Sequence, residues 1–187
     1  MNKIALIFPG IGYTCDKPLL YYGGKLLEKM GYTRIPVEYG NFPSNVKGNP
    51  EKMRQCFESA LAQSEELLKN VDFSSCDDII ILSKSVGTAV SAAYTEQKKI
   101  QVRNVLFTPV DFTFNYITDS NCIVFSGTAD PWADTSVIKE CCKNMRIPLY
   151  LTDGANHSLE TGDISFDIQN LFSVMDRVKD FILNRPQ

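Results

Sequence analysis

The chain is poor in several features that would point to particular classes of protein. It has a single histidine, and its six cysteines include no Cys-x-x-Cys pair, so we expect no metal site. Its net charge is -3 and it has no basic stretch, which argues against a nucleic-acid partner. No apolar run approaches the roughly 20 residues of a membrane span, so we expect no membrane partner.

The amino terminus and the cysteines bear on where the protein works. The apolar run Ile4–Phe8 is stopped by Pro9-Gly10 and is too short for the core of a signal peptide. We therefore interpret this run as a first strand. Because six cysteines occur without a sign of secretion, we expect free thiols and a cytoplasmic protein.

Apolar, strand-like runs alternate with helical patterns along the chain. The length of 187 residues suits one domain, and we assign residues 1–187 to it. Strands are predicted at Ile4–Phe8, Arg34–Tyr39, Asp78–Leu82, Val102–Phe107, Cys122–Ser126 and Leu149–Thr152. Helices are predicted at Leu19–Met30, from Asn49-Pro50 onward, and at Ser85–Tyr94, Asp134–Asn144 and Phe166–Leu183.

Strands that are apolar throughout and joined by helices predict a parallel sheet covered on both faces. The fold class is therefore α/β, a three-layer α/β/α doubly wound arrangement with a mostly parallel sheet of about six strands. Pro36 lies within the second strand, which places that strand near an edge. Core packing explains the apolar stripe of the last helix, which consists of Ile168, Leu171, Phe172, Met175, Val178 and Ile182.

The segment Ile79–Ala89 has the layout of a nucleophile elbow. A buried strand ends in Ser83-Lys84-Ser85, and a helix rich in small residues follows at once. Such a sharp strand-to-helix turn lifts one serine hydroxyl above the edge of the sheet. The motif Ser-x-Ser-x-Gly is weak by itself. Its position between a strand and a helix makes Ser85 the candidate nucleophile.

Asp130 and His157 complete the order Ser, Asp, His along the chain. A serine hydroxyl needs a base, and histidine, with an ordinary pKa of about 6.5, is suited to that role. A carboxylate must then orient the imidazole. We prefer Asp130 because Asp134 looks better placed to cap the next helix and Asp153 lies too near His157. Each predicted residue follows a strand, so all three should converge at the carboxyl edge of the sheet.

The oxyanion of a tetrahedral intermediate needs preorganised N–H donors. One is expected from Val86, directly after the nucleophile and at the start of a helix. The other is expected from the turn after the first strand, at Ile11 with Gly12 as the alternate.

Several further side chains are predicted near the same edge. Tyr13, Trp132 and Lys84 are candidates for lining a substrate pocket. For Lys84, packing of the aliphatic stem near the elbow is the simpler interpretation, and attraction of an anionic substrate is the weaker one. Cys15 is conceivable as a nucleophile, but the strand-turn-helix context belongs to Ser85.

The chain resembles the α/β-hydrolase superfamily over almost its whole length, in the compact form without a lid that includes dienelactone-hydrolase-like and minimal esterase domains. Ser83–Gly87 resembles G-x-S-x-G with serine in place of the first glycine, and Pro9–Gly12 resembles the H-G-x-G oxyanion loop with proline in place of histidine. Gly127–Asp130 and Asn156–Ser158 resemble the acid and base loops. The resemblance implies a minimal hydrolase fold with no cap domain, in which residues Val110–Ser120 form at most a short flap.

These features predict a serine hydrolase that needs no cofactor and cleaves a small carboxylic ester or thioester through an acyl-enzyme intermediate. Its partner would be a small-molecule acyl substrate, and no feature sets an oligomeric state. Two other classes stay open. A non-catalytic module of the same fold would bind a partner without chemistry. A nucleotide-binding domain would use Gly10-Ile11-Gly12, but Cys15 replaces the third glycine of G-x-G-x-x-G and Pro18 delays the helix.

Overall fold

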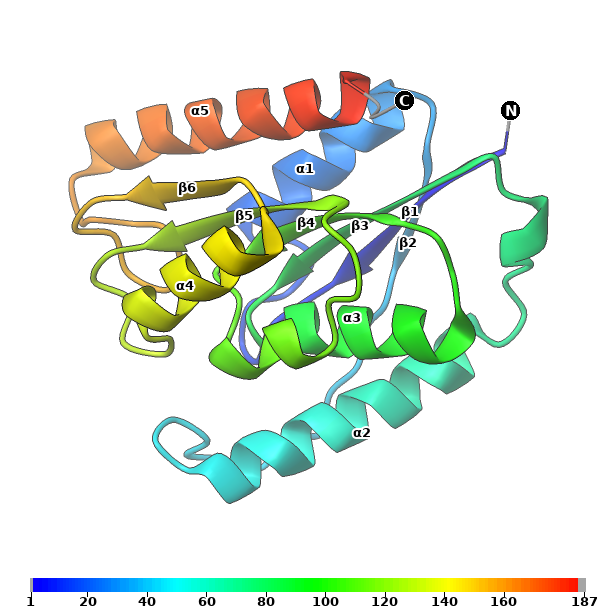
Figure 1. Ribbon diagram of the computed structural model, residues 1–187, viewed down its shortest axis with the longest axis horizontal. Coiled ribbons are helices and arrows are strands. Elements are labelled where there is room, and N and C mark those ends of the chain that lie inside the picture. The colour runs from blue at the N-terminus through cyan, green and yellow to red at the C-terminus, as the bar shows by residue number, and fades with distance from the viewer. Residues whose placement is uncertain (1, 185–187) are drawn as a thin grey trace.

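A computed structural model describes residues 2–184 of the chain. Within these residues a sheet of six strands is parallel throughout, in the order β2-β1-β3-β4-β5-β6 (Figure 1). The strands are β1 (Lys3–Phe8), β2 (Thr33–Pro36), β3 (Asp78–Lys84), β4 (Arg103–Phe107), β5 (Cys122–Gly127) and β6 (Leu149–Thr152).

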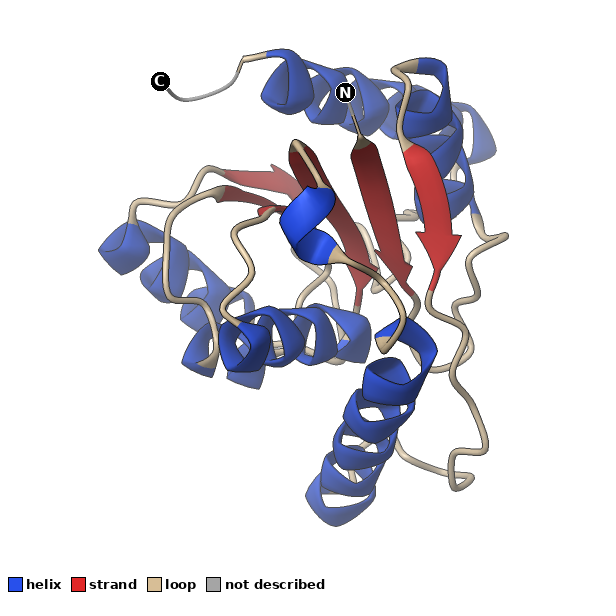
Figure 2. Ribbon diagram, turned by 90° about the vertical axis from the view of Figure 1, so that its right-hand side faces the viewer, coloured by secondary structure: helices blue, strands red, loops and turns tan. Residues whose placement is uncertain are grey.

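Helices cover both faces of the sheet (Figure 2). The elements are α1 (Pro18–Lys29), α2 (Pro50–Leu68), α3 (Val86–Lys98), α4 (Thr135–Met145) and α5 (Ile164–Leu183), with short 3-10 helices η1 (Phe73–Ser75) and η2 (Asp111–Asn115). Helices α1 and α5 lie on one face, and α2, α3 and α4 lie on the other. No helix within residues 2–184 is long and apolar enough to cross a membrane. The predicted α/β fold class is confirmed, without a cap domain among the described residues.

Strand β3 illustrates why these sequences form buried strands. Ile80 and Leu82 pack into the core under α1 and α5, whereas Ile79 and Ile81 pack into the core under α2 and α3. Side chains of a strand alternate between the two faces, so a central strand with helices on both sides must be apolar at every position. The apolar segment Ile79–Leu82 therefore forms the central strand that leads into the elbow.

Strand β2 is shorter than predicted and lies at the edge of the sheet, as Pro36 indicated. It ends at Pro36 rather than at Tyr39. Proline has no N–H to donate to a neighbouring strand, which is tolerated at an edge. Val37 still donates one hydrogen bond to the Ile7 carbonyl (2.9 Å) before the chain leaves the sheet.

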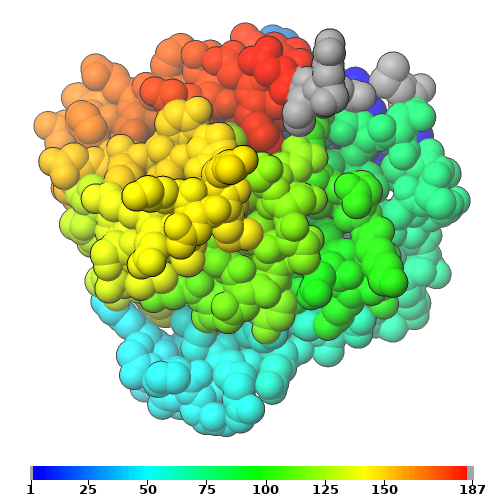
Figure 3. Space-filling model, viewed as in Figure 1, coloured from blue at the N-terminus to red at the C-terminus, as the bar shows by residue number. Residues whose placement is uncertain are grey.

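The prediction that core packing explains the whole apolar stripe of α5 is wrong in part. Val178 and Ile182 are buried, but Ile168 and Phe172 are 64% and 73% exposed. The apolar face of the helix is wider than the sheet and α1 can cover. Helix α5 runs along the upper rim of the molecule in the space-filling view (Figure 3), with this part of its surface open.

Candidate active site

Ser85 lies in a strained turn between β3 and α3. Its φ is 57° and its ψ is -129°, a backbone conformation that residues with a side chain seldom adopt. The turn is held on both sides, because the Ser85 N–H donates to the Phe107 carbonyl (3.0 Å) and the Thr88 hydroxyl donates to the Ser85 carbonyl (2.6 Å). A β-carbon at Gly87 would lie 2.3 Å from the Pro9 carbonyl oxygen, so only glycine fits there.

Ser83 takes the place of the first glycine in the elbow motif without disturbing the turn. Its side chain is fully buried, and its hydroxyl donates to the Val105 carbonyl on the neighbouring strand (3.3 Å). The serine side chain is small enough for this position, and the Val105 carbonyl accepts the hydrogen bond that a buried hydroxyl needs to donate. The replacement is therefore compatible with the elbow.

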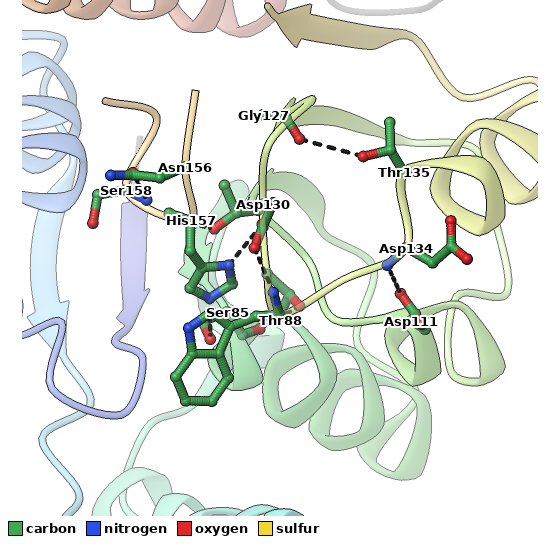
Figure 4. Close-up of polar contacts among 12 residues, drawn as sticks. Ser85, Thr88, Asp111, Gly127, Asp130, Asp134, Thr135, Asn156, His157 and Ser158 are labelled. Carbon is green, nitrogen blue, oxygen red and sulfur yellow. Dashed lines mark hydrogen bonds and ion pairs between the residues drawn. The ribbon is translucent and has the colours of Figure 1, made fainter. Parts of the chain in front are cut away.

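The structure brings the three residues predicted for a triad into one hydrogen-bonded row (Figure 4). His157 Nε2 lies 2.7 Å from the Ser85 Oγ, and His157 Nδ1 lies 2.7 Å from Asp130 Oδ2. The second carboxylate oxygen of Asp130 accepts from the Trp132 N–H (2.8 Å). In the tautomer with its proton on Nδ1, the imidazole donates to Asp130 and accepts from Ser85. That is the arrangement a general base requires.

The environment keeps the imidazole uncharged at neutral pH. Burial lowers the pKa of His157 from its ordinary value, and the positive charges of Lys84 and Lys47 act in the same direction. The hydrogen bond to Asp130 opposes this shift but does not outweigh it. The contact between His157 and Asp130 is therefore a hydrogen bond of a neutral imidazole, which becomes an ion pair only when the ring takes up a proton.

Thr108 is a site residue that the sequence did not reveal. It follows β4, is fully buried, and has a φ of 42°, which is unusual for a β-branched residue. Its hydroxyl donates to the His157 carbonyl (3.0 Å) and its N–H donates to the Phe125 carbonyl (2.7 Å). Since Phe107 holds the backbone of Ser85, two consecutive residues at the end of β4 anchor the candidate nucleophile and the candidate base.

The acid and base loops are also fastened to each other. The Ala129 N–H donates to the Ala155 carbonyl (3.0 Å). A β-carbon at Gly127 would lie 2.1 Å from the same carbonyl oxygen, so the close approach depends on that glycine. In the base loop, the Asn156 side chain accepts from the Ser158 N–H (2.7 Å). These contacts fix the direction in which His157 points.

The predicted oxyanion turn lies against the elbow. Its own hydrogen bonds join the N–H of Gly10 to the Tyr13 carbonyl (3.0 Å) and the N–H of Tyr13 to the Gly10 carbonyl (3.3 Å). A β-carbon at Gly10 would lie 2.9 Å from the β-carbon of Ser85. Ile11 and Gly12 form the tip of this turn, and Val86 is the first residue of α3.

The three pocket candidates have different surroundings. The Trp132 ring stacks on the His157 ring, with 5.5 Å between the centroids, and therefore borders the row of three residues. The Tyr13 hydroxyl accepts from the Leu19 N–H (3.1 Å), and burial raises the pKa of Tyr13 to about 12. Lys84 is fully buried, which does not fit a side chain that contacts a substrate. Burial also raises the pKa of the Cys15 thiol to about 11, so it lacks the thiolate that a nucleophile needs.

Asp134 caps α4, as the sequence suggested. Its carboxylate accepts from the Ser136 N–H (2.8 Å), and its own N–H donates to Asp111 (3.1 Å). It therefore points away from His157 (Figure 4). Asp153 accepts from the Thr128 hydroxyl (2.9 Å). Of the three carboxylates considered, Asp130 is the one that contacts the imidazole.

Neither of the two cavities described below is lined by Ser85, Asp130 or His157. A cavity of about 900 Å³ lies at the opposite edge of the sheet, beside Asp78 and Arg103. A smaller cavity of about 350 Å³ adjoins the base loop, between the starts of α1 and α5, and is lined in part by Leu19, Leu159 and Ile164. Within residues 2–184, no cluster of three or more His, Cys, Asp or Glu side chains could hold a metal ion.

Comparison with known proteins relates the fold to solved structures. No protein-family model matches the sequence, and no curated protein matches it either. A protein from Xanthomonas campestris pv. campestris, assigned to the α/β-hydrolase superfamily, is similar in structure with a TM-score of 0.68 and 10% identity, over 97% of this chain and 99% of that chain.

Two further structures are similar over nearly the whole chain. An α/β serine hydrolase without a lid from Xanthomonas campestris has a TM-score of 0.63 and 11% identity, over 98% of this chain and 84% of that one. Est1E from Butyrivibrio proteoclasticus, solved with ferulic acid bound, has a TM-score of 0.67 and 12% identity, over 97% and 88%. Residues 2–184 therefore have the fold of these α/β-hydrolase structures and contain no lid domain.

Proposed function

We propose that this protein is a serine hydrolase that cleaves small carboxylic esters or thioesters through an acyl-enzyme intermediate. The observation that carries the proposal is the row from Ser85 through His157 to Asp130, with two contacts of 2.7 Å, built on a strained strand-to-helix turn. The similarity to hydrolase structures supports a hydrolase in general, and this row of residues supports the serine type.

In the proposed reaction, the Ser85 oxygen attacks the acyl carbon while its proton passes to His157 Nε2. Asp130 stays ionised and stabilises the imidazolium that forms. When the tetrahedral intermediate collapses, the bond to the leaving group breaks and the departing alcohol or thiol takes the proton from His157. A water molecule then attacks the acyl-serine with His157 again as the base, and the carboxylic acid leaves with Ser85 restored.

The oxyanion would be stabilised by backbone N–H groups from two elements. Val86 offers the first, at the positive end of the α3 dipole. The tip of the turn after β1 offers the second, from Ile11 or Gly12, because Gly10 and Tyr13 use their own N–H groups within the turn. The contact between Gly10 and Ser85 supports this assignment, since it holds the turn beside the nucleophile.

Small substrates are favoured because residues 2–184 contain no cap domain that would enclose a long acyl chain. The cavity of about 350 Å³ beside the base loop is lined by neither Ser85 nor His157 and does not set the size of the substrate. The six cysteines are free thiols, which supports a cytoplasmic location.

Hydrolysis of p-nitrophenyl acetate and of an acetyl thioester tests the proposal directly. Wild-type protein should turn over at least one of the two, with a burst of acyl-enzyme visible by intact mass. Ser85→Ala should lose turnover while it remains folded. Ser158→Ala is the matched control, because Ser158 neighbours His157 in the base loop but does not contact the nucleophile. Equal turnover by Ser85→Ala and wild type would refute the assignment of Ser85, and well-folded wild-type protein that hydrolyses neither compound would favour a binding module.

A further inference from the structure

The residue before the candidate nucleophile, Lys84, carries a buried amine without a hydrogen-bond partner among the described residues. Lys84 is 0% exposed. Removing an ammonium group from water is costly unless the charge is paired. The ring of Tyr13 lies beside the amine, with its centroid 4.9 Å from the Nζ. A residue that costs stability at such a position calls for a functional explanation.

The titratable groups that face Lys84 come from three loops at the carboxyl edge of the sheet. Tyr13 lies in the turn after β1, Asp130 follows β5, and Glu160 precedes α5. Tyr13 stays uncharged, because its pKa is raised to about 12. The Asp130 carboxylate is engaged with His157 and with the Trp132 N–H. Glu160 acts on the amine only through space.

Lys84 therefore changes charge in the pH range in which the protein would work. Burial lowers the pKa of Lys84 to about 7, against the opposing charges of Asp130 and Glu160. Above that pH the amine is neutral, and below it the amine becomes an ammonium. The charged groups that face His157 are Asp130, Lys84 and Lys47, and both lysines lower its pKa.

We propose that Lys84 is a positioning residue of the triad, a buried amine whose charge acts on His157 through space and keeps the imidazole free of a proton in acidic solution. This inference rests on the proposed function, in which the unprotonated imidazole is the base for Ser85. Two positive charges that act on each other in a poorly solvated site repel, so a proton on Lys84 disfavours a proton on His157. In alkaline solution the amine is neutral, and it then does not oppose the imidazolium that forms during the reaction.

The single histidine of the chain allows a direct test that needs no turnover. The titration of the His157 imidazole can be followed by NMR in wild type and in Lys84→Met, in which a side chain of similar length carries no charge. The midpoint should be higher in Lys84→Met. Lys98→Met is the matched control, because Lys98 lies at the far end of α3 and pairs with Glu65. An unchanged or lower midpoint in Lys84→Met would overturn the inference.

Lys47→Met provides a graded comparison. Lys47 lies on an exposed loop with its Nζ 5.9 Å from the Trp132 ring centroid, so solvent screens its charge. Its removal should raise the His157 midpoint by less than the removal of Lys84. An equal or larger effect of Lys47→Met would contradict a special role for the buried amine.

The pH profile of kcat/KM gives the second readout. The acid limb of Lys84→Met should move to higher pH, so that its rate at pH 5.5 relative to its own maximum falls several-fold below that of wild type. A merely structural role would lower the rate at every pH by the same factor. If the NMR midpoint moves but no ester or thioester is hydrolysed, the coupling stands and the proposed function fails. If hydrolysis depends on Ser85 but the midpoint does not move, the proposed function stands and this inference fails.

Discussion

The two ends of strand β3 differ in whether a buried basic side chain has hydrogen-bond partners. At the amino end, Asp78 accepts a hydrogen bond from Arg103 (2.8 Å), and the guanidinium also donates to the Tyr32 hydroxyl (3.2 Å) and to the Ile182 carbonyl (2.8 Å). At the carboxyl end, Lys84 is also deeply buried, but its Nζ lies over the Tyr13 ring and has no hydrogen-bond partner within residues 2–184. The first cation joins α5 to the sheet, and the second lies next to the candidate nucleophile.

The amino end of β3 therefore contributes to stability, whereas the carboxyl end carries the proposed chemistry at a cost in stability. A buried guanidinium surrounded by acceptors has its lost hydration replaced. Strained backbone at Ser85 and Thr108 and an unpaired amine at Lys84 all occur at the opposite edge. Backbone strain and unpaired buried groups cost stability. They persist where the surrounding structure holds them in place, and they occur most often at functional sites. Variants at the two ends should therefore separate activity from stability.

The largest effect is expected from Asp130, the acid of the proposed triad. Asp130→Asn should lower kcat by about 10⁴, because an amide favours the wrong tautomer of the imidazole. The melting temperature should change far less than the rate. Asp134→Asn, which alters only a helix cap, should keep a rate close to that of wild type. If Asp134→Asn lost the activity instead, the assignment of the acid would be wrong.

The reverse pattern is expected at the amino end. Arg103→Met should lower the free energy of unfolding by about 3 kcal/mol, because it breaks a buried ion pair and removes two hydrogen bonds to carbonyls near the end of α5. Denaturant titration measures this loss. The kcat/KM per folded molecule should match wild type, and a large loss of kcat/KM would contradict the separation of the two ends.

Lys84→Met should stabilise the protein by ~2 kcal/mol, because a buried charge is replaced by an apolar side chain of similar length. The pKa of Lys84 is about 7 in the folded state and 10.5 ordinarily, so the unfolded chain binds the extra proton between these values. The gain from Lys84→Met should be largest below pH 7 and should shrink as pH rises towards 10.5. A gain that does not depend on pH, measured by denaturant titrations at pH 6 and pH 10, would show that the folded and unfolded states bind the same number of protons at Lys84, so that burial does not lower the pKa of Lys84.

The smallest effect is expected from the anchor of the base loop. Thr108→Val removes the hydrogen bond to the His157 carbonyl, which is worth about 1 kcal/mol, and should lower kcat/KM by about five- to tenfold. Thr108→Ser keeps the hydroxyl and should restore most of the rate. Equal rates for the two variants would indicate that packing, rather than the hydrogen bond, holds the base loop.

Local patterns in the sequence predicted most of this fold and the meeting of the three residues of the proposed triad. Ser85, Asp130 and His157 each follow an apolar strand, and parallel strands bring such positions to one edge. Thr108 could not be found in this way. Its hydrogen-bond partner, His157, lies 49 residues further along the chain. Threonine rarely adopts a positive φ, so the residue type gave no reason to expect one at this position.

The exposed part of α5 and the burial of Lys84 could not be predicted from the spacing of apolar residues, because both depend on contacts between distant segments. The apolar pattern of α5 predicted one buried stripe, but how much of a helix is covered depends on the width of the layer beneath it, and Ile168 and Phe172 lie outside it. The burial of Lys84 is likewise a result of the loops that close over the elbow. A charged residue at the end of a strand is more often expected to reach solvent.

Intact-mass labelling with a fluorophosphonate probe tests the activated serine most directly. Wild-type protein should gain the mass of one adduct, Ser85→Ala should gain none, and Ser158→Ala should be labelled like wild type. This result would establish that Ser85 is an activated nucleophile, as its contact with His157 and the contact of His157 with Asp130 predict. Well-folded wild-type protein that takes up no label, or label that persists in Ser85→Ala, would contradict the account.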